Sequence, residues 1–361
     1  MLTERQKYIA WRILFGAAVL LALLETTMSV LWRESWGDEF FSAFEGYLIL
    51  TGEFVPFRDG IFGYGPLVIG TYSAVHYLVG PDLYAARMLS AAFFLCSLAM
   101  ISLIARGLAG KWAGVAALFL VLSNFLLVSI YMSATMYSLV MFLLLSVVWV
   151  DMRPLRPIYK RLFAAVVLAA VVLARPHMVA AVIIYLTYLA ARKTAARELL
   201  SFIGVFGFVV GAGYLPIIAG NPAIALSFVL SPFISFGPYG SLPSPSVSQS
   251  FSRFWEMLAE FLKEYYGFLV FFTTTVFYIF LVQRRRLYRF MQSEPTYMLL
   301  VLLSAGLSAA HYFYWRFSGN LFYANYFMPF VILAGVAGLF RFLPGERFAY
   351  VLLGAVLALS Y

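Results

Sequence analysis

Long apolar runs dominate the chain, and short polar segments separate one run from the next. The runs are roughly 13 to 22 residues long, and an α-helix needs about 20 apolar residues to cross a bilayer. The chain lacks the regular polar and apolar periodicity of helices on the surface of soluble proteins. This pattern predicts an all-α polytopic membrane protein.

The limits of the apolar runs predict eleven membrane-spanning helices. They fall at residues 13–31, 83–104, 113–130, 136–150, two within 162–191, 199–220, 265–282, 297–310, 326–340 and 349–361. Residues 162–191 fit either one over-long helix or a hairpin of two short helices. Basic residues stand at both ends of this segment, so a hairpin with Arg175 near its outer tip agrees best with the charges. Residues 68–80 fit either a span or a helix that lies in the membrane interface. Only the interfacial interpretation keeps most of the Lys and Arg residues on one side of the membrane.

Composition supports a membrane protein, because 63% of the residues are apolar, 11% are charged and the mean hydropathy is +0.91. Soluble domains carry about 25% charged residues. The net charge of +9 indicates orientation rather than a nucleic-acid partner, since Lys and Arg are retained on the cytoplasmic side. Eighteen Lys and Arg fall on the predicted inner side and seven at the outer side. We therefore expect a multi-pass protein of the plasma (inner) membrane with a cytoplasmic N-terminus.

The chain is expected to form one domain over residues 1–361, with two large outer loops at residues 32–82 and 221–264. The first loop includes juxtamembrane helices, and its residues 34–59 hold six of the sixteen acidic residues, set among Trp, Phe and Tyr side chains. Aromatic residues of this kind settle at a membrane–water boundary. A carboxylate-rich loop held at the outer face of a bilayer indicates the functional part of the protein.

Two adjacent acids near the start of this loop, Asp38 and Glu39, are the first candidates for chemistry. A general base needs a carboxylate close to a bound hydroxyl, and an interfacial helix by itself has no need of both acids. The alternative is that Asp38 only stabilises the first turn of a helix. Glu45 lies on the same predicted polar stripe and is either part of the pocket or solvated. Asp59 and Tyr64 follow in a turn-rich segment, as polar walls of the pocket or as parts of a tight loop.

Four motifs follow one another in the sequence: the Asp38–Glu39 pair after the first span, an Arg58-Asp59-Gly60 turn, a Gly65-Pro66-Leu67 re-entry and Ala86-Arg87-Met88 at a helix start. Their order resembles the GT-C glycosyltransferases, in particular the subgroup of protein O-mannosyltransferases and aminoarabinose transferases. The resemblance covers about residues 13–200. Further on, Tyr326 lies in Asn325-Tyr326-Phe327-Met328-Pro329, which is similar to a family Arg/His-Tyr-x-x-Pro motif and adds Tyr326 to the pocket.

The resemblance implies a GT-C-like helical bundle and a polyprenyl-phosphate sugar donor. It implies that Asp38, and with it Glu39, acts as catalytic base or as ligand of a divalent metal ion; no cofactor is fixed by the sequence. Three features depart from the family pattern. Tyr64-Gly65-Pro66 replaces a Lys-Pro-Pro motif, residues 131–137 carry no acid, and Asn325 replaces a basic residue. Because of these departures, the resemblance does not specify the donor head group, the metal dependence or the phosphate contacts at these positions.

Transfer from a lipid phosphate develops negative charge on the leaving group, so cations are expected where it departs. Arg175 is the first candidate, and Arg87 and Arg316 follow. The alternatives are that Arg87 pairs with Asp82 or Glu45, and that Arg175 and Arg316 reach lipid head groups.

The sequence therefore predicts an inverting glycosyltransferase that moves a sugar from a polyprenyl-phosphate donor to a hydroxyl of a glycan, lipid or protein on the extracytoplasmic face. The rival hypothesis is a transporter or lipid flippase. Transporters place ionisable groups at the membrane midplane and often contain repeated halves. Here the acids gather in the outer loop and no repeated halves are evident.

Overall fold

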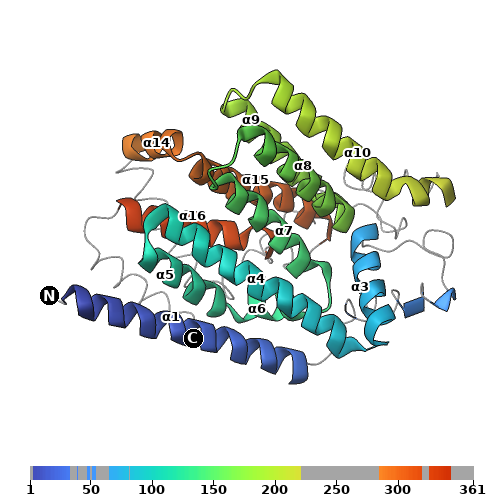
Figure 1. Cartoon of the computed structure of the whole chain (residues 1–361), viewed down its shortest axis with the longest axis horizontal. Coiled ribbons are helices and arrows are strands. Elements are labelled where there is room, and N and C mark those ends of the chain that lie inside the picture. The colour runs from blue at the N-terminus through green and yellow to red at the C-terminus, as the bar shows by residue number, and fades with distance from the viewer. Residues whose placement is uncertain are drawn as a thin grey trace. The chain divides into compact units, whose positions relative to one another are not determined.

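The computed structural model describes residues 3–32, 39, 47–48, 51–53, 65–80, 82–220, 284–318 and 325–342. The regular elements of these segments are helices, drawn in Figure 1. They group into two compact units. The first comprises Met1–Met28, Leu95–Ser129 and Val247–Tyr361, and the second comprises Ser29–Phe94 and Ile130–Ser246. We describe each unit separately.

Four of the described helices are long and apolar enough to cross a membrane. They are α1 (Glu4–Trp32), α4 (Leu83–Ala109), α8 (Pro157–Ala174) and α10 (Ala196–Gly220). Further apolar helices accompany them, which confirms the predicted all-α polytopic membrane architecture. Their bounds are α3 (Pro66–Val79), α5 (Lys111–Leu122), α7 (Met136–Asp151), α9 (Val179–Ala191) and α16 (Met328–Phe342). Helix α15 (Pro295–Ser318) is apolar over Pro295–Ala310.

In the first unit, α16 is buried almost all round and packs against α5 and α15. The Tyr297 hydroxyl on α15 donates a hydrogen bond to the Ala334 carbonyl of α16, over 3.3 Å. Gly114 allows α5 to approach α4 closely, because a Cβ at this position would lie 2.9 Å from the Ser102 carbonyl oxygen. Small residues at helix contacts permit such close approach of two backbones in membranes.

Two helices of this part of the chain differ from the sequence prediction. The expected span at residues 113–130 is divided into α5 and α6 (Phe125–Met132). The break has a local cause, since the Asn124 side-chain oxygen accepts the Leu127 N–H over 2.9 Å and so caps a new helix. Residues 284–293 lie between two predicted spans and were expected as a basic loop. They form α14 (Arg284–Ser293), in which Leu287 and Phe290 are buried and the arginine side chains are exposed.

In the second unit, residues 157–191 form the predicted hairpin. Helix α8 ends at Ala174, a short 3-10 helix η1 (Pro176–Met178) follows, and α9 returns. Arg175 adopts an extended backbone at the break, with φ −147° and ψ 102°. The residue before a proline is driven away from helical geometry, so Pro176 fixes the position of the turn.

The open end of the hairpin is held by a buried polar cluster. Arg161 on α8 donates to the Tyr185 hydroxyl on α9 over 3.1 Å and lies 3.5 Å from the Asp151 carboxylate at the end of α7. The Tyr188 hydroxyl donates to the other Asp151 oxygen over 2.9 Å. Because these contacts join the start of α8 to the end of α9, they confirm the hairpin and exclude one over-long helix.

Removing the Tyr188 hydroxyl tests how much this cluster stabilises the hairpin. Tyr188→Phe should lower the free energy of unfolding by about 1.5–3 kcal/mol, the range for hydrogen bonds to charged groups. Tyr159→Phe is the matched control, because Tyr159 on α8 is 56% exposed whereas Tyr188 is 1% exposed. Thermal unfolding of the detergent-solubilised protein measures both. Equal shifts in the two variants would contradict the structural role of the cluster.

Helix α3 follows the first predicted loop. It packs against α8 and α10 and runs across their direction in Figure 1. Its 14 residues make it about 21 Å long at 1.5 Å per residue, short for a span of about 30 Å. This length is compatible with the predicted interfacial position of the segment, which stays a prediction.

Candidate functional site

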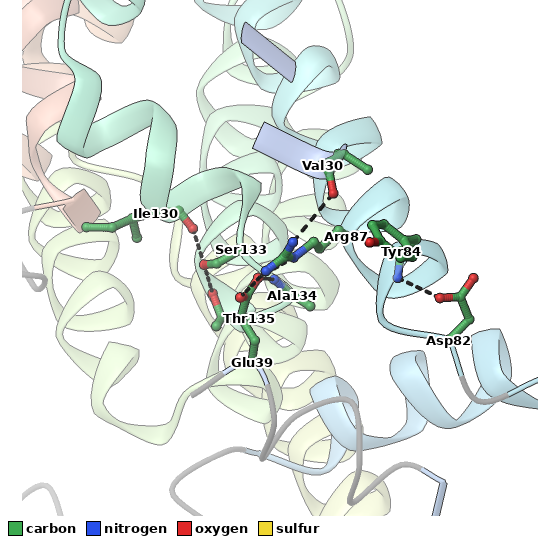
Figure 2. Close-up of polar contacts among 9 residues, drawn as sticks. All are labelled: Val30, Glu39, Asp82, Tyr84, Arg87, Ile130, Ser133, Ala134 and Thr135. Atoms are coloured by element: carbon green, nitrogen blue, oxygen red, sulfur yellow. Dashed lines mark hydrogen bonds and ion pairs between the residues drawn. The ribbon is translucent and has the colours of Figure 1, made fainter. Parts of the chain in front are cut away.

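Glu39 and Arg87 form a buried ion pair in the second unit (Figure 2). Arg87 Nε donates to Glu39 Oε1 over 3.0 Å, and Nη2 donates to Oε2 over 2.8 Å. This two-bond arrangement is the strongest geometry available to an arginine and a carboxylate. Glu39 is 0% exposed and Arg87 is 3% exposed, so water scarcely screens the pair.

Among the described residues, two backbone groups also bind this pair, and we call Glu39, Arg87, Val30 and Ala134 the Glu39 cluster. The Ala134 N–H donates to Glu39 Oε1 over 2.9 Å, and Arg87 Nη1 donates to the Val30 carbonyl over 3.4 Å. A buried ion pair is tolerable only when further hydrogen bonds satisfy its remaining atoms. The cluster meets this condition with backbone from α1 and from the joint before α7.

The position of Arg87 is set by the start of α4. Asp82 Oδ1 accepts the Tyr84 N–H over 2.9 Å, which caps the first turn of the helix. Arg87 lies in the following turn. Asp82 Oδ1 therefore caps the backbone of α4, and Arg87 forms its ion pair with Glu39. The other partner considered from sequence, Glu45, lies outside the described residues.

The joint between α6 and α7 supplies the Ala134 donor. Ser133 Oγ donates to the Ile130 carbonyl and lies 3.0 Å from Thr135 Oγ1, as Figure 2 shows. These contacts hold the chain in a turn, so that the Ala134 N–H is free of helical hydrogen bonds and points at Glu39. Sequence reasoning missed the role of this joint. The available signal was a short polar stretch, Ser133-Ala134-Thr135, inside an otherwise apolar region.

Tyr72 on α3 connects the joint to α4. Its hydroxyl donates to the Thr135 carbonyl over 2.9 Å, and the Ser90 hydroxyl lies 2.7 Å away. A phenol has one proton to give, so Ser90 is the donor in the second contact. Burial raises the pKa of the Tyr72 hydroxyl, which keeps it protonated and able to donate. Through Tyr72, α3 is attached to the same region as the Glu39 cluster.

A second attachment joins the start of α3 to the tip of the α8–α9 hairpin. The Gly65 N–H donates to the Ala174 carbonyl over 3.0 Å. The approach requires glycine, because a Cβ at residue 65 would lie 1.9 Å from the Leu173 carbonyl oxygen. Arg175, the next residue of the hairpin, is 7% exposed. The chain that leaves the first loop is thus bonded directly beside the buried Arg175.

The structure brings two of the predicted site residues into contact, Glu39 and Arg87, and places Arg175 in the same unit. Tyr326 is 1% exposed and belongs to the first unit, immediately before α16. Arg316 lies in α15. The remaining predicted site residues lie outside the described residues: Asp38, Glu45, Asp59 and Tyr64.

The described residues contain no group of three or more His, Cys, Asp or Glu side chains placed to hold a metal ion. Glu39, one of the two predicted ligands, has a donor against each carboxylate oxygen. A metal cation on Glu39 would also face the positive charge of Arg87 at hydrogen-bond distance. In this geometry Glu39 does not fit the role of metal ligand.

Taken together, the helices and their order define a polytopic membrane protein with the GT-C fold. The structure of ArnT from Cupriavidus metallidurans bound to undecaprenyl phosphate is similar over 94% of this chain, with a TM-score of 0.66 and 15% sequence identity. The apo ArnT structure is similar over 96% of the chain, with a TM-score of 0.62 and 15% identity. The predicted GT-C fold is therefore confirmed.

An archaeal oligosaccharyltransferase also has a similar structure. AglB from Archaeoglobus fulgidus, in complex with an inhibitory peptide and a dolichol-phosphate, matches 99% of this chain with a TM-score of 0.54 and 14% identity. The chain corresponds to 62% of the length of ArnT and 56% of AglB. No protein-family model and no curated protein sequence matches the chain. These similarities define the fold, and activity has to be argued from the site.

Proposed function

We propose that the protein is an inverting glycosyltransferase that takes a sugar from a polyprenyl-phosphate donor. The observation that supports this most directly is the buried Glu39–Arg87 pair, whose Glu39 follows the predicted base Asp38 in the sequence of a protein with the GT-C fold. Two proteins of similar fold have structures with undecaprenyl phosphate or dolichol-phosphate bound, which are ligands of the proposed donor class. The acceptor in this proposal is a hydroxyl of a glycan, lipid or protein.

In the proposed reaction Asp38 is the general base. It takes the proton of the acceptor hydroxyl as the oxygen attacks the anomeric carbon, and the bond from that carbon to the lipid phosphate breaks. A single displacement inverts the anomeric centre and needs one base, whereas a retaining glycosidase needs two carboxylates about 5 Å apart. Glu39 is less suited to this role, because its carboxylate is 0% exposed and already accepts three hydrogen bonds, two on Oε1 and one on Oε2.

We assign Glu39 and Arg87 the role of a positioning pair. Asp38 is covalently bonded to Glu39, so fixing Glu39 against Arg87 and Ala134 restricts the backbone that carries the proposed base. Because the charge of Arg87 is balanced by Glu39, Arg87 attracts a donor phosphate less strongly than an arginine without a paired carboxylate would. Arg175 is therefore the preferred phosphate-binding residue in this proposal, and Arg316 is the second candidate.

We further propose that the loop with Asp38 faces the extracytoplasmic side and that the N-terminus is cytoplasmic. The support is the distribution of Lys and Arg along the sequence. Polyprenyl-phosphate sugars are membrane-bound donors, so a site at the surface of the bilayer suits them.

The test is a transfer assay with Asp38→Asn in purified full-length protein. The wild type is incubated with a panel of radiolabelled polyprenyl-phosphate sugars, with and without EDTA, and release of polyprenyl phosphate is measured. Asp38→Asn should reduce release about 10²- to 10⁴-fold, the usual contribution of a general base, without changing the melting temperature. Full activity in the variant would contradict the role of Asp38.

A matched control is Glu53→Gln, because Glu53 is an exposed acid of the same predicted loop. This variant should keep wild-type release. If no donor is consumed and the protein instead moves polyprenyl lipid across liposomes, the flippase hypothesis replaces the transferase. EDTA sensitivity would assign a metal ion to the reaction and would require ligands other than Glu39.

A further inference from the structure

An apolar groove runs between α1, α4 and α5 in the first unit, with a cavity volume of about 430 Å³. Its walls are Phe15 and Ala22 from α1, Leu98 and Ala99 from α4, and Leu118 from α5. From Trp11 to Leu23 the groove follows twelve residues of α1, about 18 Å at 1.5 Å per residue. One leaflet of a bilayer has a hydrocarbon depth of about 15 Å, so the groove has the length of one acyl chain.

The charged residues of the groove lie at one end. Arg106 and Lys111 line it there, beside Trp11, whose indole N–H donates to the Lys111 carbonyl over 3.2 Å. No acidic residue lines the groove, and within the described part of the chain Arg106 makes no ion pair. Arg12, which does not line the groove, and Lys111 both lie over the Tyr8 ring, at 4.6 Å and 5.8 Å from its centroid. The groove thus combines an apolar body with an uncompensated positive end.

The cations of the groove fall on the side of the membrane opposite Asp38 in the orientation proposed above. Arg106 and Lys111 are among the Lys and Arg residues on the predicted inner side, whereas Asp38 lies in the predicted outer loop. A lipid whose head lies at Arg106 therefore belongs to the leaflet opposite the proposed donor site, so the occupant is not the sugar donor.

We infer that this groove binds one anionic glycerophospholipid, with an acyl chain along α1 and the phosphate at Arg106 and Lys111. An acyl chain fits the apolar walls, and a negative head group complements the two cations. Basic residues near a membrane surface each contribute about 1 kcal/mol to the attraction of anionic lipids. The bound lipid fills the space beside α1, the helix that leads into the first loop.

Native mass spectrometry of the delipidated full-length protein tests the inference. Phosphatidylglycerol and phosphatidylcholine with identical acyl chains are added separately, and the fraction of protein that retains one lipid is measured. Phosphatidylglycerol should bind more tightly. Arg106→Gln with Lys111→Gln should weaken its binding about 30-fold, since each residue contributes about a fivefold factor. Equal binding of both lipids, or unchanged binding in this double variant, would overturn the inference.

Two further variants distinguish lipid binding in the groove from lipid binding by general surface charge. Arg153→Gln with Arg156→Gln removes two exposed cations of the second unit and should leave lipid retention unchanged. Ala22→Phe narrows the groove without changing charge and should abolish retention of phosphatidylglycerol while the melting temperature shows that the protein remains folded. Retention in Ala22→Phe would place the lipid elsewhere and overturn the inference.

Fluorescence quenching locates the bound lipid independently. Phosphatidylglycerol with bromine atoms near the head-group end of its acyl chain should quench Trp11, which lies at the charged end of the groove. The quenching that saturates with one lipid should disappear in Trp11→Phe and persist in Trp149→Phe, a tryptophan of the second unit. Persistence in Trp11→Phe would contradict occupation of this groove.

Discussion

Arg87→Met is expected to destabilise the protein by about 3–5 kcal/mol, because it leaves the Glu39 carboxylate buried without its cation. Glu39 is fully buried and accepts two charge-assisted hydrogen bonds from Arg87, so no water replaces them. Methionine keeps much of the length of the side chain, which limits the effect to the loss of charge and hydrogen bonds. Equilibrium unfolding of the purified protein measures the change, and the transfer assay should show a parallel loss of activity.

The double variant Glu39→Gln with Arg87→Met distinguishes an ion pair from two separate contributions. Replacing both charges should recover part of the stability lost in Arg87→Met, since a missing pair costs less than one unpaired buried charge. The matched control is Glu4→Gln. Glu4 pairs with Lys7 over 3.0 Å, but its side chain is 84% exposed, so this change should cost no more than about 1 kcal/mol. If Arg87→Met destabilised the protein no more than Glu4→Gln does, this result would contradict the structural importance of the Glu39 cluster.

The double variant also separates stability from positioning. If Glu39 and Arg87 act through the Asp38 backbone, activity in the double variant should stay low even where stability is recovered. The expected signature is a reduced kcat with an altered KM for the acceptor, because the proposed base is misplaced while Arg175 is untouched. Full recovery of activity would show that the pair serves only to stabilise the fold.

Gly65→Ala is expected to reduce transfer about 10²-fold, the cost of moving a reacting group by about 1 Å. The added Cβ would lie 1.9 Å from the Leu173 carbonyl oxygen and 2.6 Å from its carbonyl carbon. Both atoms belong to the backbone of α8, so no side-chain rotation relieves the clash. The chain must separate from the hairpin tip, which breaks the hydrogen bond from Gly65 to the Ala174 carbonyl.

Gly70→Ala is the control for this change, since Gly70 lies on the same helix and a Cβ there meets nothing within 4 Å. Alanine favours a helix interior by about 0.8–1 kcal/mol relative to glycine, so Gly70→Ala should be neutral or stabilising. Melting temperatures and donor turnover of the two variants are compared side by side. Wild-type activity in Gly65→Ala would contradict the close approach of α3 to the hairpin.

Much of the architecture could be predicted from the sequence, because a bilayer imposes strict rules on a chain. Backbone groups in hydrocarbon must be hydrogen-bonded internally, so long apolar runs become helices. The hairpin at residues 157–191 was predictable for the same reason, from charges at both ends and Pro176 at the turn. The Asn124 cap that divides α5 from α6 and the short amphipathic helix α14 depend on a few local contacts, which hydropathy does not register.

For the functional site, the sequence decided less and the tertiary structure decided more than for the architecture. The sequence by itself determined a helical membrane protein, the acid-rich loop after the first span and the candidates Asp38, Glu39, Arg87 and Arg175. Only the tertiary structure decided that Glu39 and Arg87, forty-eight residues apart, are partners and that Ala134 joins them. The physical reason is that a charged side chain in an apolar surrounding must find its counter-charge, whereas sequence spacing carries no record of which distant residue supplies it.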